Sequence, residues 1–250
     1  MSRVVILDTE TTGLKQPEAV EIAWIELSQD INEVRNNPPD IYNESSFVSW
    51  FEQRYLPTKA IEEGASKVTG IYMKDVIDCP SIKTFVFPED ITYIIGHNIG
   101  YDHRVLNKPN VKLICTKELA QMFLQDKNLK NNKLTTIVEF LFEDGKALVE
   151  NAHGALHDCK LVYLILHQIL QKVNPTTVSS WEDLAKFCSQ GKQTYEQSSE
   201  KVIILKLMPF GKHKDEEFKN IPTSYLSWLL NQDNLSPSLR ATLVHQLADR

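Results

Sequence analysis

A short apolar run that leads directly into two carboxylates is the feature that most constrains this chain. Residues 4–14 read VVILDTETTGL, so four apolar side chains come immediately before Asp8, and Glu10 follows two positions later. A short apolar run bounded by turn-forming residues is typical of a buried strand. Side chains two positions apart in a strand point to the same face, so we expect Asp8 and Glu10 to lie together. Close carboxylates repel each other unless a cation lies between them; the alternative is a pair of solvated acids in a turn.

Two further acids follow predicted core elements. Asp102, in GHNIGYDHRVL, comes just after a predicted strand and near the start of a helix. Asp158 lies in the first turn of the amphipathic helix predicted over residues 155–173. Acids near a helix N-terminus are also common for electrostatic reasons alone. The helix after Asp158 is strongly apolar, however, so we expect this end to pack on the sheet. Four acids at the ends of core elements indicate an oxygen-lined site for Mg²⁺ or Mn²⁺ rather than Zn²⁺.

A histidine near the last of these acids has the chemistry of a general base. His153 precedes Asp158 by five positions, which on one helix is a rotation of about 140°. The two would then not share a face, so we expect His153 in the loop before the helix, able to turn toward the acids. An imidazole titrates in the range suited to taking a proton from water. The alternative is a solvent-facing loop histidine. Of the rivals, His157 should point elsewhere on its helix, and His97 should pack or hydrogen-bond at a strand end.

The remaining periodicity predicts an α/β fold. After the opening strand, further strands are expected at residues 20–27, 47–53, 91–98 and 111–116. Helices are expected at residues 117–125, 134–143 and 155–173. The polar segment 30–46 carries a double proline, and we predict that it is a loop.

A separate helical segment of about 50 residues is predicted at the C-terminal end. Before it, Ser180 and Asp183 form a candidate capping box for a short helix, and residues 188–201 form a polar linker. The last helix should begin with Ser236 as its N-cap and Pro237 in its first position.

Composition narrows the classes of protein that fit. No segment approaches the 18 or so uncharged apolar residues of a membrane span, so no membrane association is expected. The start MSRVVILD lacks the apolar region and cleavage site of a signal peptide. The four cysteines include no CxxC pair and fit reduced thiols, so we expect a cytoplasmic protein. A net charge of −6 is unusual for a non-specific nucleic-acid binder, so any contact with a polyanion should be confined to local patches.

Three motifs together resemble a known enzyme family. DTETTGL at 8–14, HNIGYD at 97–102 and HGALHD at 153–158 are similar to the three motifs of the DEDDh group of 3′→5′ exonucleases. This group belongs to the proofreading-exonuclease superfamily, which has an RNase H-like fold. Each motif is weak alone, but all three in this order are highly specific. The later segment MPFGKHKDEEFKNIPTSYLSWLL is similar to the C-terminal segment of exodeoxyribonuclease X-like enzymes.

The resemblance implies an RNase H-like architecture with an appended unit. The expected fold is a mixed five-stranded sheet flanked by helices, plus a small, mostly α-helical C-terminal unit. The expected domains are an exonuclease domain over residues 1–174, a linker with a short helix over 175–200, and a DNA-contact unit over 201–250.

The resemblance also implies two-metal hydrolysis that releases 5′-mononucleotides from DNA 3′ ends. Four acids would hold two Mg²⁺ ions, or Mn²⁺ in their place: Asp8, which would bridge both ions, Glu10, Asp102 and Asp158. His153 would be the general base. Five residues would bind substrate: Thr11, Leu14 as a wedge against the terminal base, Asn98 as a hydrogen-bonding support, Lys212 and Lys214.

The expected partners are single-stranded DNA or DNA 3′ ends, with RNA as the alternative. The oligomeric state is left open, with a homodimer as one alternative. Two positions depart from the family pattern. Thr69 stands where family members often have a histidine near the terminal nucleotide, and Asp215 stands where a glycine is common after FGKxK.

Three other interpretations remain at this point. The opening stretch alone also resembles a phosphohydrolase of the haloacid-dehalogenase type, in which Asp8 would be a nucleophile. Glu10 then replaces the second aspartate of that motif, and no matching lysine and Asp-Asp motif follows. A catalytically idle nucleic-acid-binding module is disfavoured because all five site residues are present. An exoribonuclease with the same chemistry is not excluded by the core motifs, and only the C-terminal segment favours DNA.

Overall fold

This computed structural model of the chain describes residues 2–43, 47–124, 129–150, 154–189, 205–230 and 237–248. It divides into two compact units, Met1–Gly191 and Lys192–Arg250, which are described separately below. The finer boundaries expected at residues 174 and 200 stay a prediction. In the part of the chain that is described, none of the helices has both the length and the apolarity needed to cross a bilayer.

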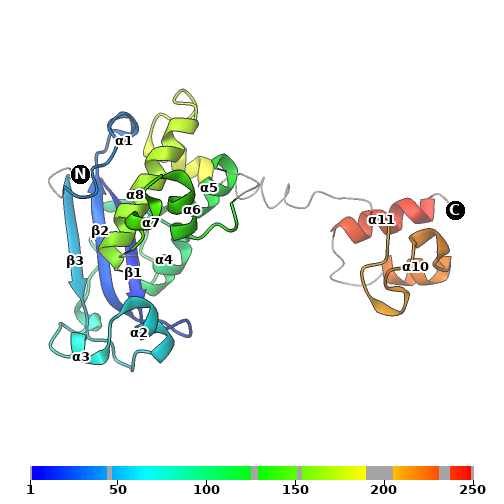
Figure 1. Ribbon diagram of the computed structural model, residues 1–250, viewed down its shortest axis with the longest axis horizontal. Coiled ribbons are helices and arrows are strands. Elements are labelled where there is room, and N and C mark those ends of the chain that lie inside the picture. The colour runs from blue at the N-terminus through cyan, green and yellow to red at the C-terminus, as the bar shows by residue number, and fades with distance from the viewer. Residues whose placement is uncertain are drawn as a thin grey trace. The chain divides into compact units, whose positions relative to one another are not determined.

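A mixed sheet forms the centre of the first unit (Figure 1). Its strand order is β3-β2-β1-β4-β5; β1 pairs antiparallel with β2 and parallel with β4. The five strands are β1 Arg3–Thr11, β2 Ala19–Leu27, β3 Ser49–Arg54, β4 Ile91–Gly96 and β5 Lys112–Cys115. The predicted mixed five-stranded sheet is therefore confirmed, with strand ends shifted by one to two residues.

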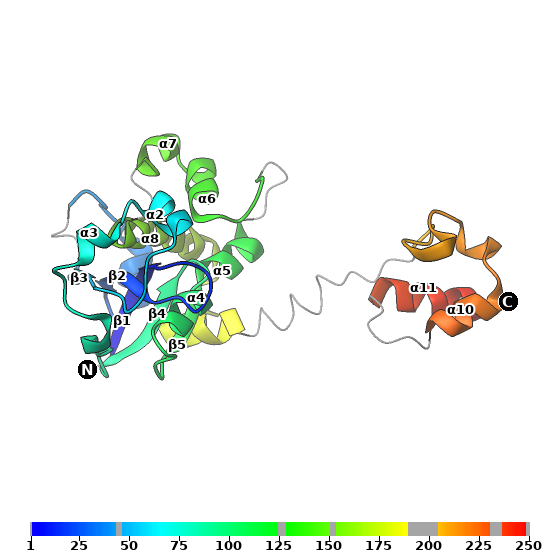
Figure 2. The ribbon, with the colours of Figure 1, turned by 90° about the horizontal axis from the view of Figure 1, so that it is seen from below.

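The long helix α8 (Ala155–Lys172) lies across β1 and β2 and covers one face of the sheet. Its apolar side is buried in the core except for the partly buried Leu164, as the predicted helix 155–173 requires. Figure 2 shows α6 and α7 on the same side of the sheet as α8, and α5 and α6 pack directly against α8. The other helices and turns of this unit are α1 Ile31–Asn36, α2 Glu63–Thr69, α3 Met73–Val76, η2 Ile82–Thr84, α4 Gly100–Val105, α5 Thr116–Phe123, α6 Leu134–Leu141 and α7 Gly145–Leu148.

The loop predicted over residues 30–46 is wrong in its first part, where α1 forms. Asp30 caps this helix, because its side chain accepts a hydrogen bond of 2.8 Å from the backbone N–H of Asn32. Ile31 and Val34 are buried in the core, and the Arg35 guanidinium donates to a backbone carbonyl at the end of α8. The helix was not predicted because the segment is polar, and because its packing partners lie far along the chain.

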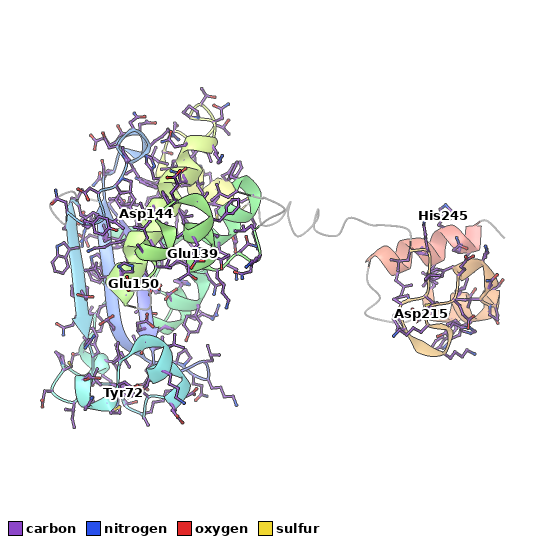
Figure 3. All side chains as sticks on the ribbon, viewed as in Figure 1. Tyr72, Glu139, Asp144, Glu150, Asp215 and His245 are labelled. Carbon is purple, nitrogen blue, oxygen red and sulfur yellow. The ribbon has the colours of Figure 1, made fainter. Side chains whose placement is uncertain are left out.

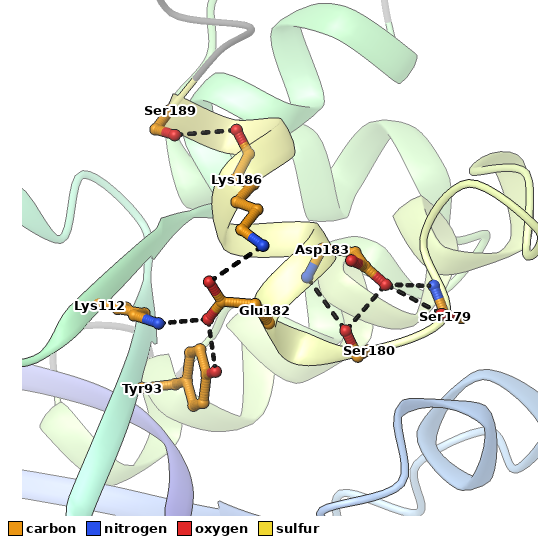
Figure 4. Close-up of polar contacts among 8 residues, drawn as sticks. All are labelled: Tyr93, Lys112, Ser179, Ser180, Glu182, Asp183, Lys186 and Ser189. Atoms are coloured by element: carbon orange, nitrogen blue, oxygen red, sulfur yellow. Dashed lines mark hydrogen bonds and ion pairs between the residues drawn. The ribbon is translucent and has the colours of Figure 1, made fainter.

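A second correction concerns the segment after α8. Helical residues 181–189 pack into the core of the first unit, and Cys188 is buried there. The predicted linker 188–201 is therefore wrong for its first two residues, and the rest of it lies outside the described residues. Figure 4 shows how this helix is attached. The Glu182 carboxylate accepts a hydrogen bond of 2.8 Å from Tyr93 on β4 and pairs with Lys112 on β5. The serine half of the predicted capping box is present, since the backbone N–H of Asp183 donates to Ser180 Oγ. The Asp183 carboxylate accepts from Ser180 Oγ and from the backbone N–H of Ser179.

The second unit has a hydrophobic core of its own, built from Met208, Phe218, Ile221, Leu226, Leu229, Leu239 and Leu243. Its elements are η3 Gly211–His213, η4 Phe218–Asn220, α10 Thr223–Leu230 and α11 Pro237–Ala248. The last helix begins at Pro237, as predicted, whereas its predicted cap Ser236 lies outside the described residues. Asp215, labelled in Figure 3, lies in the turn between η3 and η4.

Candidate active site

Three of the predicted acids meet at one edge of the sheet. Asp8 and Glu10 are both within β1 and share a face, and Asp158 comes from the first turn of α8. Carboxylate oxygens of these three residues all lie within 4.8 Å of one another. The strand fixes the first two side chains and the packed helix fixes the third, so the cluster is held by rigid elements.

The fourth acid, Asp102, is anchored to the same strand. Its Oδ1 accepts a hydrogen bond of 3.1 Å from the backbone N–H of Thr9 and one of 2.7 Å from Thr9 Oγ1. Thr9 lies between Asp8 and Glu10, so α4 holds the buried Asp102 carboxylate beside the cluster. The parallel pairing of β1 with β4 makes this possible, because it brings the carboxyl ends of both strands to one edge.

The site has an excess of negative charge. Burial, followed by the Asp158 and Glu21 carboxylates, raises the pKa of Glu10 to about 8. Burial and the neighbouring acids raise the pKa of Asp8 well above its usual range. Burial also raises the pKa of Asp102, but only to about 6, because the Thr9 hydrogen bonds stabilise its ionised form. A bound cation would relieve the repulsion among these carboxylates and favour their ionised forms.

The donor atoms fit a hard divalent cation. The cluster offers carboxylate oxygens, and the nearby Cys159 does not add a thiolate. Its thiol donates to the Ala23 carbonyl, and burial raises its pKa well above its usual range. Oxygen ligands without sulfur or imidazole suit Mg²⁺ or Mn²⁺ better than Zn²⁺.

Of the three histidines considered, His153 lies outside the described residues, so its role stays a prediction. The rivals are placed as expected. His157 Nε2 is 2.7 Å from the Leu148 carbonyl of α7, away from the acids. His97 lies after β4 and hydrogen-bonds through both ring nitrogens, to Thr116 Oγ1 and to the Asn132 carbonyl.

A cavity of about 570 Å³ lies beside the acids. Three predicted substrate-binding residues line it: Thr11, Leu14 and Asn98. Leu14 is 84% exposed, which suits a side chain that contacts a ligand. Asn98 is exposed and has a left-handed backbone with φ 72°, a conformation that asparagine tolerates. The predicted hydrogen-bonding role of Asn98 stays a prediction.

Tyr101 was missed by the sequence reasoning. Its hydroxyl lies 2.9 Å from Thr11 Oγ1 and donates to the Gly13 carbonyl at 3.0 Å. Tyr101 also lines the cavity, so it fixes the loop that carries Leu14. Its position directly before Asp102 is the one signal that could have identified it.

The cavity's opposite wall is α2 and the residue before it. Gly13 has φ 149°, a conformation that side chains rarely adopt, and the Glu62 carboxyl group packs against it, so that a Cβ would lie 2.3 Å from the carboxyl carbon. Thr69 lines the cavity at the position where the family pattern has histidine, and its hydroxyl accepts a hydrogen bond from the backbone N–H of Ile71. The Thr69 hydroxyl is therefore already engaged by the backbone of the loop that follows α2.

A buried carboxylate on the next strand was also missed. Glu21 on β2 lies directly opposite Glu10 and is 3% exposed. Its Oε1 accepts a hydrogen bond of 2.8 Å from Arg54 Nε on β3. The sequence signal was a single acid inside the apolar run VEIAWIEL. The remaining predicted residues, Lys212 and Lys214, are exposed in the second unit.

Comparison with known proteins gives matches to both parts of the chain. A family model described as "Exonuclease" matches residues 5–166. A second model, described as "Putative quorum-sensing-regulated virulence factor", matches residues 196–244. Exodeoxyribonuclease 10 of Escherichia coli (strain K12) is 26% identical over 251 aligned residues, which is 97% of each chain.

Two solved structures are similar in fold. Exonuclease X in complex with 5′ overhanging duplex DNA is 24% identical, with a TM-score of 0.51. The match covers 74% of this chain and 99% of that one. The zinc-bound form of the E. coli ExoI–ssDNA complex is 15% identical, with a TM-score of 0.50, and the match covers 81% of this chain and 45% of that one. At these identities the likeness concerns the fold alone.

Proposed function

Because this chain belongs to the exonuclease family whose model matches residues 5–166, we propose that it shortens DNA from the 3′ end by metal-assisted hydrolysis and releases 5′-mononucleotides. The observation that carries this proposal is the carboxylate cluster of Asp8, Glu10 and Asp158 beside a cavity large enough for a nucleotide. Family membership also disfavours the phosphohydrolase interpretation of Asp8.

Two Mg²⁺ ions, or Mn²⁺, would be held by Asp8, Glu10, Asp102 and Asp158. When bound, such ions supply positive charge to the phosphate and make a bound water more acidic. The protein's own contribution is rigidity: β1 and the start of α8 hold the carboxylates in place before any ligand arrives. Their raised pKa values support the proposal, since repulsion among the acids is relieved only by protons or cations.

His153 would be the general base. It lies two residues before Ala155, the first residue of α8, and five before Asp158. A base on this segment could take a proton from water next to the acids, and its imidazole has the appropriate range of pKa.

The cavity would receive the terminal nucleotide. Leu14 would pack against the terminal base, and Thr11 would hold the loop that carries Leu14 through its contact with Tyr101. Asn98 would support the site by hydrogen bonding from the cavity wall. Thr69 is smaller than the histidine common in the family, so we expect weaker contact with the nucleotide on that wall.

Lys212 and Lys214 would neutralise phosphates upstream of the 3′ end. Both are exposed, in a chain whose net charge is −6. Replacing both with alanine should weaken binding of a long single strand and flatten its dependence on salt by about 1.4 in the log–log slope, at about 0.7 per phosphate contact on a single strand.

We propose DNA rather than RNA as the substrate, because exodeoxyribonuclease 10, which is 26% identical, aligns over 97% of the chain. The test uses 5′-labelled DNA and RNA strands of one sequence, incubated with Mg²⁺ and then with a chelator. We expect a ladder of labelled DNA fragments shortened from the 3′ end, lost when metal is removed. Immediate release of a labelled mononucleotide, or no cleavage at all, would overturn the proposal; faster shortening of RNA would instead favour the exoribonuclease alternative.

A further inference from the structure

The second unit carries an aromatic surface built around Tyr225. The turn η3 folds onto this ring: Lys212 Nζ lies 5.0 Å from the ring centroid, and the His213 ring lies edge-on at 4.6 Å. Gly211 is required at this turn, because its φ is 76° and a Cβ would lie 3.1 Å from Tyr225 Oη. The turn and α10 therefore form one surface rather than two independent ones.

Trp228 extends this surface to solvent. It follows Tyr225 by three positions on α10, so the two side chains share a face, and their ring centroids are 5.5 Å apart. The adjacent face of α10 supplies Leu226 and Leu229 to the core, and the half-buried Tyr225 packs against that core. From the apolar spacing of this segment we predict that Trp228 and Phe218 both pack inside the unit. Phe218 is buried, whereas Trp228 is 55% exposed. That prediction is confirmed for Phe218 and wrong for Trp228.

The charges around this surface favour an anionic partner. Among the described residues, Lys212 and Lys214 have no ion-pair partner. Two of the three nearby acids are paired: Glu216 contacts His213, and Glu217 pairs with Lys219. The third, Asp215, follows Lys214 directly and offsets part of its charge. Lys212 lies over the Tyr225 ring, next to the exposed Trp228. A cation and an exposed aromatic ring together offer the two contacts that single-stranded nucleic acids use, phosphate neutralisation and base stacking.

We propose that Tyr225, Trp228 and Lys212 form a stacking platform for the unpaired bases of a single-stranded nucleic acid. This inference rests on the proposed function, since it is that activity which brings a polynucleotide to the chain. Stacking requires a free base face, so the platform should select single strands over duplexes. Binding by one unit also raises the effective concentration of the same strand for the other unit.

The test compares Trp228→Ala with Trp50→Ala in the full chain. Trp50 is a matched control, because it is an exposed tryptophan, 44% accessible, on β3 of the first unit. Fluorescence anisotropy with a labelled thymidine 30-mer, in a chelator so that the strand is not cut, gives the affinity. We expect Trp228→Ala to weaken binding by about fivefold or more and Trp50→Ala to leave it unchanged.

A strand of the same length made of abasic sites separates stacking from charge. Trp228→Ala should bind it as the wild type does, whereas Lys212→Ala should weaken binding of both strands and lower the salt slope by about 0.7. Lys219→Ala is the matched charge control, because Lys219 already pairs with Glu217. Equal loss on the abasic strand, or no loss on the thymidine strand, would overturn the platform.

Three further outcomes separate the alternatives. If Trp228→Ala instead loses binding only to vesicles of phosphatidylcholine and phosphatidylglycerol, the surface serves a membrane and the proposal is wrong. If the wild-type chain cleaves no nucleic acid yet shows the expected loss on the thymidine strand, the proposed function fails and the platform stands. If it cleaves DNA and Trp228→Ala binds as Trp50→Ala does, the platform alone fails.

Discussion

The backbone N–H of Ala155, the first residue of α8, donates a hydrogen bond of 3.0 Å to Oε2 of Glu21 on β2. Asp158 lies three residues further along the helix, so Glu21 fixes the helix end that carries a predicted metal ligand. Two groups compensate for the buried charge: the helix N-terminus, which favours an anion, and Arg54, which pairs with the other oxygen. Glu21 therefore positions the site without belonging to it.

Replacing Glu21 should disturb both stability and the use of metal. Glu21→Ala leaves a buried backbone donor unsatisfied, so we expect the free energy of unfolding to fall by about 1–3 kcal/mol. We also expect a higher Mg²⁺ concentration at half-maximal activity, because Asp158 is less well placed. Glu26→Ala is the control: it lies on the same strand and pairs with Arg3, but is remote from the acids. Identical metal dependence in Glu21→Ala and wild type would contradict the positioning role.

Removing a proposed metal ligand should separate activity from folding. Asp8→Asn or Asp158→Asn should leave a folded protein with almost no nuclease activity. Because repulsion at the cluster is relieved, the chelated Asp8→Asn protein should melt at a higher temperature than chelated wild type. Thermal melts with and without Mg²⁺, beside the oligonucleotide ladder, measure both effects. Retention of full activity would end the proposal.

The same carboxylates predict how stability depends on pH. The pKa of Glu10 is raised to about 8 in the folded protein, against about 4.3 in an unfolded chain. Between these values the unfolded chain has released a proton that the folded chain keeps, so metal-free stability should fall as pH rises from about 4.5 to 8. Melting temperatures of the chelated protein measured across that range test this, and saturating Mg²⁺ should flatten the curve. A rise of stability with pH above 5, in chelator, would show that the acids do not act as described.

The two histidines near Asp158 should behave differently. His153→Ala should lower kcat by about 10²–10⁴-fold while Mg²⁺ still stabilises the protein. His157→Ala removes a hydrogen bond to the Leu148 carbonyl, so it should cost about 1 kcal/mol of stability and change kcat little. Measurements of kcat and of the melting temperature, for both variants side by side, test this difference. If the large loss of kcat falls on His157→Ala, the general base has been misassigned.

Much of the fold could be predicted because its signals are local. The apolar run before Asp8 and the periodicity of α8 each identify an element within a few residues. The family resemblance drawn from the three motifs is confirmed by the exonuclease model, and it supplied what periodicity alone does not: that the segments carrying Asp8, Asp102 and Asp158 belong to one site.

The rest depends on contacts between distant segments. Helix α1 is held partly by Arg35, which bonds to carbonyls 135 and 143 positions away. Glu21 and Ala155 are separated by 134 positions, so no local pattern relates them. For Trp228 the local pattern was misleading, because Trp228 is exposed while Leu226 and Leu229 fill the core and Tyr225 packs against it.

The departure from the family pattern at Asp215 has a conformational reason. Asp215 has φ 65°, a left-handed conformation in which glycine is unstrained, whereas aspartate adopts it at a small cost and most other residues at a larger one. The turn is fixed on both sides, because the N–H of Asp215 donates to the Met208 carbonyl and the N–H of Met208 donates to the Glu216 carbonyl. Asp215→Gly should therefore stabilise the second unit by about 1 kcal/mol or less. Hydrogen exchange of residues 205–230 in the full chain should slow accordingly.

Asp215→Ala separates this conformational effect from charge. Both variants remove a negative charge next to Lys214, so both should strengthen low-salt binding of a single strand if that lysine contacts phosphate. Only the glycine relieves the backbone, whereas alanine has a Cβ at the same φ and should speed exchange. Slower exchange in both variants would mean that charge, not the backbone, sets the stability of this turn. Faster exchange in Asp215→Gly would mean that the Asp215 side chain holds the turn, and the strain argument would be wrong.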